Sequence, residues 1–144
     1  MSQAHEPSGT RRRAPLALVV DDDAGYREMV RAMLTDAGYV VLEAPDGIEA
    51  LQLLAMEGAA EPDIIVLDVQ MPRMTGPELV RELRNNLRLA RIPVIFTSGA
   101  PRRPIVDVDR EPEWLPKPFD ADRLLALVRE ASDSRPARAG DGTG

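Results

Sequence analysis

The feature that most restricts the fold of this chain is the regular alternation of short apolar runs with longer segments of helical periodicity. Residues 16–20 and 64–67 are continuous apolar runs, which are typical of strands buried on both faces. Residues 24–37 place their apolar side chains on one side of a helix, and Gly38 follows where a left-handed residue often ends a helix. Strands and helices that alternate in this way form right-handed βαβ units, so we predict a doubly wound α/β fold with a parallel sheet.

The same alternation continues towards the C-terminus. Three further strands are predicted, at residues 39–43, 92–96 and 113–116. Three further helices are expected to begin after N-cap residue types, namely Asp46, Thr75 and Asp120. In the helix after Thr75, the spacing of Leu79, Leu83 and Leu87 predicts that all three face the core.

The length of 144 residues fits one domain, which we place at residues 15–131. Residues 1–14 and 132–144 are polar and aperiodic, so we expect two disordered tails and a stand-alone domain without an output domain. No apolar run approaches the roughly 18 residues of a membrane span, and no signal peptide is recognisable. We therefore expect a cytoplasmic protein without membrane contact, and the net charge of −6 argues against direct DNA binding.

Polar side chains follow the predicted strands where each strand ends. They are Asp21, Asp22 and Asp23 after the first strand, Asp68 after the third, Thr97 and Ser98 after the fourth, and Lys117 after the fifth. Ligands of such sheets bind beyond the carboxyl ends of the strands. We therefore expect carboxylates, a hydroxyl and an ammonium group to meet at one edge of the sheet.

This set of side chains has a definite chemistry. Carboxylates that lie close together repel one another, and a hard divalent cation such as Mg²⁺ or Mn²⁺ relieves the repulsion. Because Mg²⁺ takes only one or two carboxylates, one aspartate remains available as a nucleophile that can form an acyl phosphate. A lysine and a hydroxyl could then stabilise the charge on the transferred phosphoryl oxygens.

The motifs at the strand ends resemble those of the response regulator receiver domains of two-component signalling, the CheY-like superfamily. They are Leu18-Val-Val-Asp-Asp-Asp23, Leu67-Asp-Val-Gln-Met-Pro72 with Gly76, Thr97-Ser-Gly99 and Lys117-Pro-Phe119, and they occur in the order found in that family. The resemblance covers residues 16–131. It implies a five-stranded, flavodoxin-like sheet with strand order 2-1-3-4-5.

The resemblance also implies a role for the acidic residues. Asp68 would be the phosphoacceptor. Asp21 and Asp22, together with Asp68 and the backbone carbonyl of Gln70, would hold Mg²⁺. Asp23 has an alternative role as the N-cap of the first helix, which we favour because aspartate is a preferred N-cap residue.

The remaining site residues follow from the same resemblance. Lys117 would pair with a phosphoryl oxygen, and the Lys117–Pro118 bond would be cis. Ser98 would be the hydroxyl that turns towards the phosphoryl group, with Thr97 as its rival. Trp114 would be the aromatic side chain that changes position in the switch, although it could equally be part of the core.

The resemblance is weakest at residues 100–112, where a helix would be expected. This segment contains Pro101, Pro104 and Pro112 and little helical periodicity. Proline in a helix interior costs about 3 kcal/mol. We therefore predict a short, irregular or missing helix between the fourth and fifth strands.

The sequence is compatible with four functions. The favoured one is a receiver that accepts a phosphoryl group from a sensor histidine kinase or a phosphotransfer protein and signals by binding an unknown downstream protein. The chain would then not be an enzyme, apart from Mg²⁺-dependent self-phosphorylation and slow self-dephosphorylation. The alternatives are a phosphorelay intermediate or phosphate sink, a binding module that needs no phosphorylation, and a haloacid-dehalogenase-like phosphatase, suggested by the Asp21-Asp-Asp23 element.

Overall fold

The computed structural model describes residues 14–108 and 110–133. Its strands are β1 (Leu16–Val20), β2 (Val40–Ala44), β3 (Ile64–Asp68), β4 (Val94–Ser98) and β5 (Glu113–Pro116). Its helices are α1 (Ala24–Asp36), α2 (Gly47–Ala55), α3 (Gly76–Arg84) and α4 (Ala121–Asp133). All neighbouring strands are parallel, and their order is β2-β1-β3-β4-β5. The predicted α/β class and strand order are confirmed.

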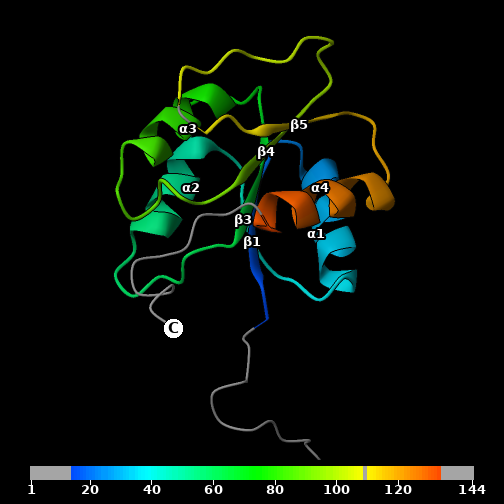
Figure 1. Ribbon diagram of the computed structural model, residues 1–144, viewed down its shortest axis with the longest axis horizontal. Coiled ribbons are helices and arrows are strands. Elements are labelled where there is room, and N and C mark those ends of the chain that lie inside the picture. The colour runs from blue at the N-terminus through cyan, green and yellow to red at the C-terminus, as the bar shows by residue number, and fades with distance from the viewer. Residues whose placement is uncertain (1–13, 109, 134–144) are drawn as a thin grey trace, which may run out of the picture.

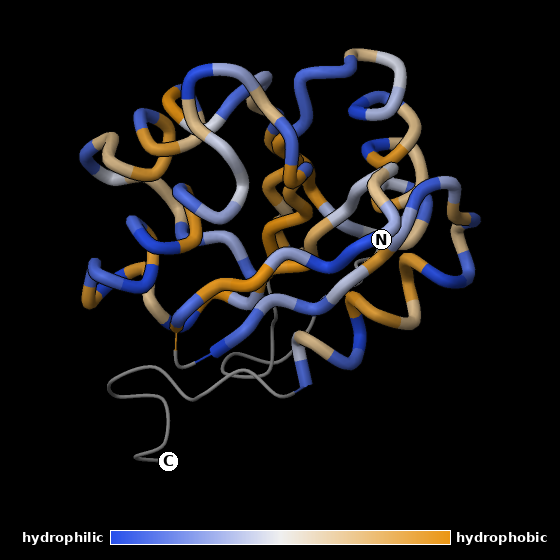
Figure 2. Tube along the Cα trace, turned by 90° about the horizontal axis from the view of Figure 1, so that it is seen from above, coloured by the Kyte–Doolittle hydropathy of each residue, from blue (hydrophilic) through white to orange (hydrophobic). Residues whose placement is uncertain are grey.

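The sheet lies between two layers of helices. Helices α1 and α4 cover one face, and α2 and α3 cover the other (Figure 1). Neighbouring residues of one strand serve opposite faces, so that Leu18 packs in the cluster under α2 and α3 while Val19 packs in the cluster under α1 and α4. This explains why β1 and β3 are continuous apolar runs, which form the orange centre of the molecule in Figure 2.

The predicted helix starts agree with the structure. Asp46 accepts a hydrogen bond from the backbone N–H of Glu49 at 2.9 Å, and Asp120 accepts one from Arg123 at 2.9 Å. Thr75 and Glu78 form a reciprocal capping box at the start of α3. These caps fix where each helix begins relative to the strand before it.

One prediction about α3 is wrong. Leu87 does not face the core, since 95% of its surface is exposed, whereas Leu79 and Leu83 are fully buried. The helix ends at Arg84 with Asn85 as its C-cap, so the helical periodicity stops before it reaches Leu87. The expected tail boundary also moves slightly, because α4 continues to Asp133. Residues 1–13 and 134–144 of the expected tails lie outside the described residues.

The connection from β4 to β5 contains no helix in its described residues, as the prolines predicted. It is a long loop that passes over the top of the molecule in Figure 1 and buries Val106 against the cluster under α2 and α3. Hydrogen bonds from arginine side chains to backbone carbonyls hold the loop in place. Arg103 donates to Pro112 O at 2.7 Å, and Arg84 donates to Arg110 O at 3.3 Å. Side-chain to backbone bonds therefore take the place of the bonds of a regular helix.

Within residues 14–108 and 110–133, no helix combines the length and the apolar character that crossing a bilayer requires.

Candidate functional site

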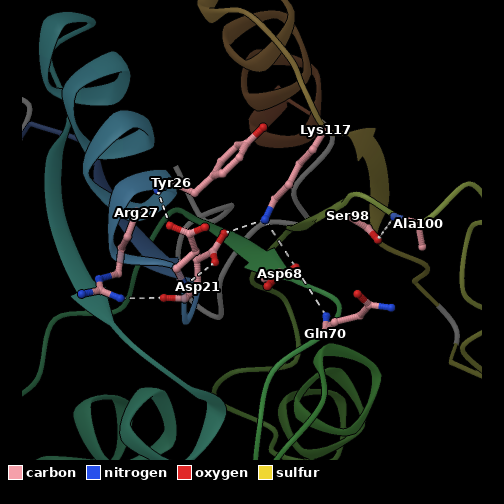
Figure 3. A network of polar contacts seen from close by, with 9 residues as sticks. Asp21, Tyr26, Arg27, Asp68, Gln70, Ser98, Ala100 and Lys117 are labelled. Atoms are coloured by element: carbon pink, nitrogen blue, oxygen red, sulfur yellow. Dashed lines mark hydrogen bonds and ion pairs between the residues drawn. The ribbon is translucent and has the colours of Figure 1, made fainter.

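The site forms where the ends of four parallel strands meet. Asp21 directly follows β1, and Asp68 and Ser98 are the last residues of β3 and β4. Backbone bonds continue the pairing past the strand ends, from Val69 N to Thr97 O at 3.0 Å and from Lys117 N to Ser98 O at 2.7 Å. The sheet register therefore brings together side chains that are far apart in the sequence (Figure 3).

Three carboxylates lie close together at this edge. Oxygen atoms of Asp21, Asp22 and Asp68 all lie within 4.8 Å of one another. Asp21 and Asp68 are buried, with 3% and 6% of their surface exposed, whereas Asp22 is exposed. The sequence predicted this grouping, and its donor set of hard oxygen atoms suits a divalent cation.

The surroundings of Asp68 disfavour its charged form. Burial raises its pKa to about 6, and the nearby carboxylates of Asp21 and Asp22 act in the same direction. Lys117 and the backbone N–H of Gln70, which donates to Asp68 Oδ1 at 3.4 Å, oppose this rise. The negative charge at the centre of the site is therefore only partly compensated by the protein itself.

Lys117 is held between two of the carboxylates. Its Nζ lies 3.1 Å from Asp21 Oδ2 and 3.7 Å from Asp68 Oδ1. The Lys117–Pro118 peptide bond is cis, as predicted. Lys117 is also the only lysine among the 144 residues, so every other permanently cationic side chain of the sequence is an arginine. The uniqueness of this lysine is a further signal in the sequence, independent of the motifs.

The first helix supports the acidic cluster from one side. Arg27 donates from Nη1 to the backbone oxygen of Asp21 at 2.7 Å and also pairs with Glu43 of β2. Asp23 caps α1 by accepting from Tyr26 N at 3.1 Å, which agrees with its alternative role. The ring of Tyr26 lies 4.2 Å from Lys117 Nζ, a contact that the sequence did not predict because Tyr26 looked like one more apolar residue of the helix.

Thr97 and Ser98 are the last two residues of β4, and Trp114 lies in the neighbouring strand β5. Ser98 and Thr97 are both buried, and Ser98 Oγ accepts a hydrogen bond from Ala100 N at 2.9 Å (Figure 3). Trp114, which pairs with Phe96 in the sheet register, is half-buried against the cluster under α2 and α3. The hydroxyl of Ser98 is thus bound within its own loop rather than to Asp68.

The space at position 76 of the motif is too small for any side chain. A Cβ atom at this position would lie 2.7 Å from the backbone oxygen of Asp68 and 3.0 Å from the ring of Phe96. Gly76 N also donates to Val69 O at 2.9 Å. Only glycine allows the start of α3 to pack this closely against the strand that carries Asp68.

Comparison with known proteins agrees with this architecture. The family model of the response regulator receiver domain matches residues 17–129. The chain belongs to this family. Its relatives include the response regulator MprA of Mycobacterium ulcerans (strain Agy99), which is 41% identical over 113 residues that make up 78% of this chain and 47% of MprA. The chain thus spans about half the length of the curated relatives it matches.

Solved receiver structures share the fold. The chemotaxis protein CheY4 of Vibrio cholerae is 34% identical with a TM-score of 0.72, covering 83% of this chain and 99% of CheY4. The receiver domain of sensor histidine kinase PA1611 from Pseudomonas aeruginosa PAO1, solved with magnesium in its active-site cleft, is 23% identical with a TM-score of 0.73, covering 85% and 100% of the two chains. Receiver domains are not conventional enzymes, and family membership leaves the haloacid-dehalogenase alternative without support.

Proposed function

We propose that this chain is a phosphorylation-controlled receiver in which Asp68 accepts a phosphoryl group from a sensor histidine kinase or a phosphotransfer protein. The observation that carries the proposal is the position of Asp68 at the end of β3, beside two further carboxylates and 3.7 Å from the ammonium group of Lys117. Such a carboxylate is a nucleophile surrounded by groups that can stabilise a phosphoryl group.

In the transfer step, a carboxylate oxygen of Asp68 forms a bond to phosphorus while the bond from phosphorus to the donor imidazole nitrogen breaks. The electron pair of the broken bond leaves with the imidazole, which takes up a proton. Lys117 is placed to pair with a phosphoryl oxygen, since its Nζ already lies close to Asp68 Oδ1. The acyl phosphate would later be removed by water, so that slow self-dephosphorylation ends the signal.

The acidic cluster fits a divalent cation, Mg²⁺ or Mn²⁺. Asp21, Asp22 and Asp68 would hold it through carboxylate oxygens, and the backbone carbonyl of Gln70 would complete the protein ligands. When bound, the cation neutralises charge on the carboxylates and the phosphoryl oxygens. Ion pairs alone do not provide this, because Lys117 is shared between Asp21 and Asp68.

We further propose that Ser98 and Trp114 transmit the change. Ser98 would release Ala100 N and turn towards the phosphoryl group on Asp68, and the loop that follows would rearrange together with Trp114. The output would be the binding of a downstream protein, in the cytoplasm and without direct contact with DNA or membrane. The stand-alone character expected from the sequence stays a prediction.

The direct test is labelling with a small phosphodonor in the presence of Mg²⁺. The wild-type protein is expected to gain a base-labile phosphoryl group, Asp68→Asn to gain none, and EDTA to suppress the wild-type reaction. Asp107→Asn, which alters an exposed carboxylate in the loop after β4, serves as the matched control and should label normally. Normal labelling of Asp68→Asn would refute the assignment.

A further inference from the structure

The first turn of α1 contacts the lysine of the site through the ring of Tyr26. The N–H of Tyr26 is bonded to the N-cap Asp23, which fixes the backbone of Tyr26. Its half-buried ring lies 4.2 Å from Lys117 Nζ and 5.8 Å, centroid to centroid, from the ring of Phe119. One aromatic side chain therefore contacts both ends of the Lys117-Pro-Phe119 segment, and Figure 3 shows it beside Lys117.

This contact restrains a side chain that is otherwise flexible. A lysine has a long four-carbon stem and a compact ammonium group with three N–H donors. Two neighbours of that group are the carboxylates of Asp21 and Asp68, at 3.1 Å and 3.7 Å. The aromatic face of Tyr26 attracts the cation without adding a negative charge, so it holds the ammonium group and leaves its charge available to a phosphoryl group.

We propose that Tyr26 is a positioning residue, whose ring face keeps the ammonium group of Lys117 aimed at the phosphoryl group on Asp68. The inference rests on the proposed role of Asp68 and adds to it a residue outside the strand-end motifs. The part of Tyr26 that matters is the ring and not the hydroxyl, because the contact with Lys117 is to the ring. Phenylalanine should therefore replace tyrosine, whereas leucine should not.

The test compares Tyr26→Phe and Tyr26→Leu in the full chain with Mg²⁺. Binding of beryllofluoride can be followed by the fluorescence of Trp114, the single tryptophan. Tyr26→Phe should keep the wild-type affinity within about twofold. Tyr26→Leu should lose about three- to thirtyfold in affinity and in the rate of phosphodonor labelling, which corresponds to about 0.7–2 kcal/mol of cation–π attraction.

The same pair is then made in a Lys117→Met background. If the ring acts through the ammonium group, Tyr26→Leu should cause no additional loss there. A loss of equal size in both backgrounds would show that Tyr26 only supports the packing of Phe119, and the proposal would be overturned. It would equally be overturned if Tyr26→Phe were as impaired as Tyr26→Leu, or if Tyr26→Leu behaved like the wild type.

A second measurement does not depend on phosphorylation. Because Lys117 is the only lysine, ¹³C-lysine labelling gives one ε-methylene signal in the NMR spectrum. In the wild type and Tyr26→Phe this signal should be displaced upfield by the ring, and in Tyr26→Leu it should return to the position of an unshielded lysine. No difference between the variants would overturn the proposed contact. By contrast, normal labelling of Asp68→Asn would overturn the phosphoacceptor role and leave this NMR result standing.

Discussion

The carboxyl group of Asp68 is buried at a point where its charge is unfavourable in the absence of a cation. Its pKa is raised to about 6, first by burial and then by Asp21, so the folded protein binds this proton more tightly than the unfolded chain does. Stability from this group is therefore fully present below the ordinary aspartate value and is lost as the pH rises from about 4 to about 6. At neutral pH the charged carboxylate of Asp68 should therefore lower the free energy of unfolding of the metal-free protein.

Asp68→Asn should consequently stabilise the protein in EDTA at pH 7.5, by about 1–3 kcal/mol, since one pKa unit corresponds to about 1.4 kcal/mol. The gain relative to wild type should be much smaller at pH 4.5, where the carboxyl of Asp68 is protonated. Urea unfolding of both proteins at both pH values measures this difference in the free energy of unfolding. Glu130→Gln, which changes an exposed carboxylate on α4, should show little gain at either pH. A gain for Asp68→Asn of the same size at both pH values would contradict the explanation.

Substitution of Lys117 should preserve the fold but reduce labelling by the phosphodonor. Lys117→Ala is expected to keep the fold and to reduce labelling by the phosphodonor, because a point charge next to Asp68 is lost. Lys117→Arg should not restore the rate, since a planar guanidinium does not fit where a compact ammonium group lies between two carboxylates. Circular dichroism checks the fold, and labelling kinetics check the rate. Rates equal to wild type in both variants would remove Lys117 from the mechanism.

At the scale of single elements, the loop between β4 and β5 depends on arginine side chains. Arg84 donates to the backbone oxygens of Ala90, Ile92 and Arg110, and so joins the end of α3 to this loop. Its guanidinium is desolvated, and burial followed by the charge of Arg110 lowers its pKa to about 10. The bond to Arg110 O holds the loop between β4 and β5, and the bonds to Ala90 O and Ile92 O hold the connection between α3 and β4, so one planar group ties the two connections together.

Arg84→Lys should therefore loosen the loop, because an ammonium group cannot reproduce the fork of donors. We expect a loss of about 1–3 kcal/mol in the free energy of unfolding and faster amide exchange in residues 100–108. Arg81→Lys on the exposed side of α3 is the matched control. Unchanged exchange in Arg84→Lys would show that apolar contacts such as that of Val106 suffice to hold the loop.

The proposed response of this loop to phosphorylation of Asp68 can be measured by the same amide exchange experiment. We expect it to be the most mobile part of the domain core in the unmodified protein and to gain amide protection across residues 101–108 when beryllofluoride is bound. The change would then be an ordering of the loop rather than the displacement of a helix. Strong protection before beryllofluoride is added would contradict this.

The starts of the helices could be predicted from the sequence, but the end of α3 could not. Asp46, Thr75 and Asp120 were identified as helix starts because capping depends on neighbours within three residues. Leu87 was misplaced, since periodicity does not reveal that α3 ends at Arg84.

Contacts between residues far apart in the sequence were also predicted only in part. The meeting of Asp21, Asp68 and Lys117 followed from parallel topology, which brings strand ends to one edge. The contact between Tyr26 and Lys117 did not, because it depends on the rotation of α1 and on side-chain conformations that no spacing encodes.

For the whole molecule, binding of Mg²⁺ and stability should be linked. A cation that binds only the folded state stabilises it by RT ln(1 + [Mg²⁺]/Kd), about 1.4 kcal/mol at ten times Kd. In thermal unfolding this should raise the wild-type Tm by a few degrees relative to EDTA. Asp21→Asn and Asp68→Asn should show a smaller shift. An equal shift in all three proteins would indicate that the ion binds elsewhere.

The absence of a helix from the described residues between β4 and β5 also affects how fast this region can rearrange. Loops rearrange in nanoseconds to microseconds, whereas helices that shift register against a core need microseconds to milliseconds. Among the described residues of this loop, the bonds that would have to break include those from the side chains of Arg84 and Arg103 to backbone carbonyls and the bond between Ser98 and Ala100. Under the proposed function, the surface presented to a partner would then follow phosphorylation of Asp68 without delay, and the lifetime of the acyl phosphate alone would set the duration of a signal.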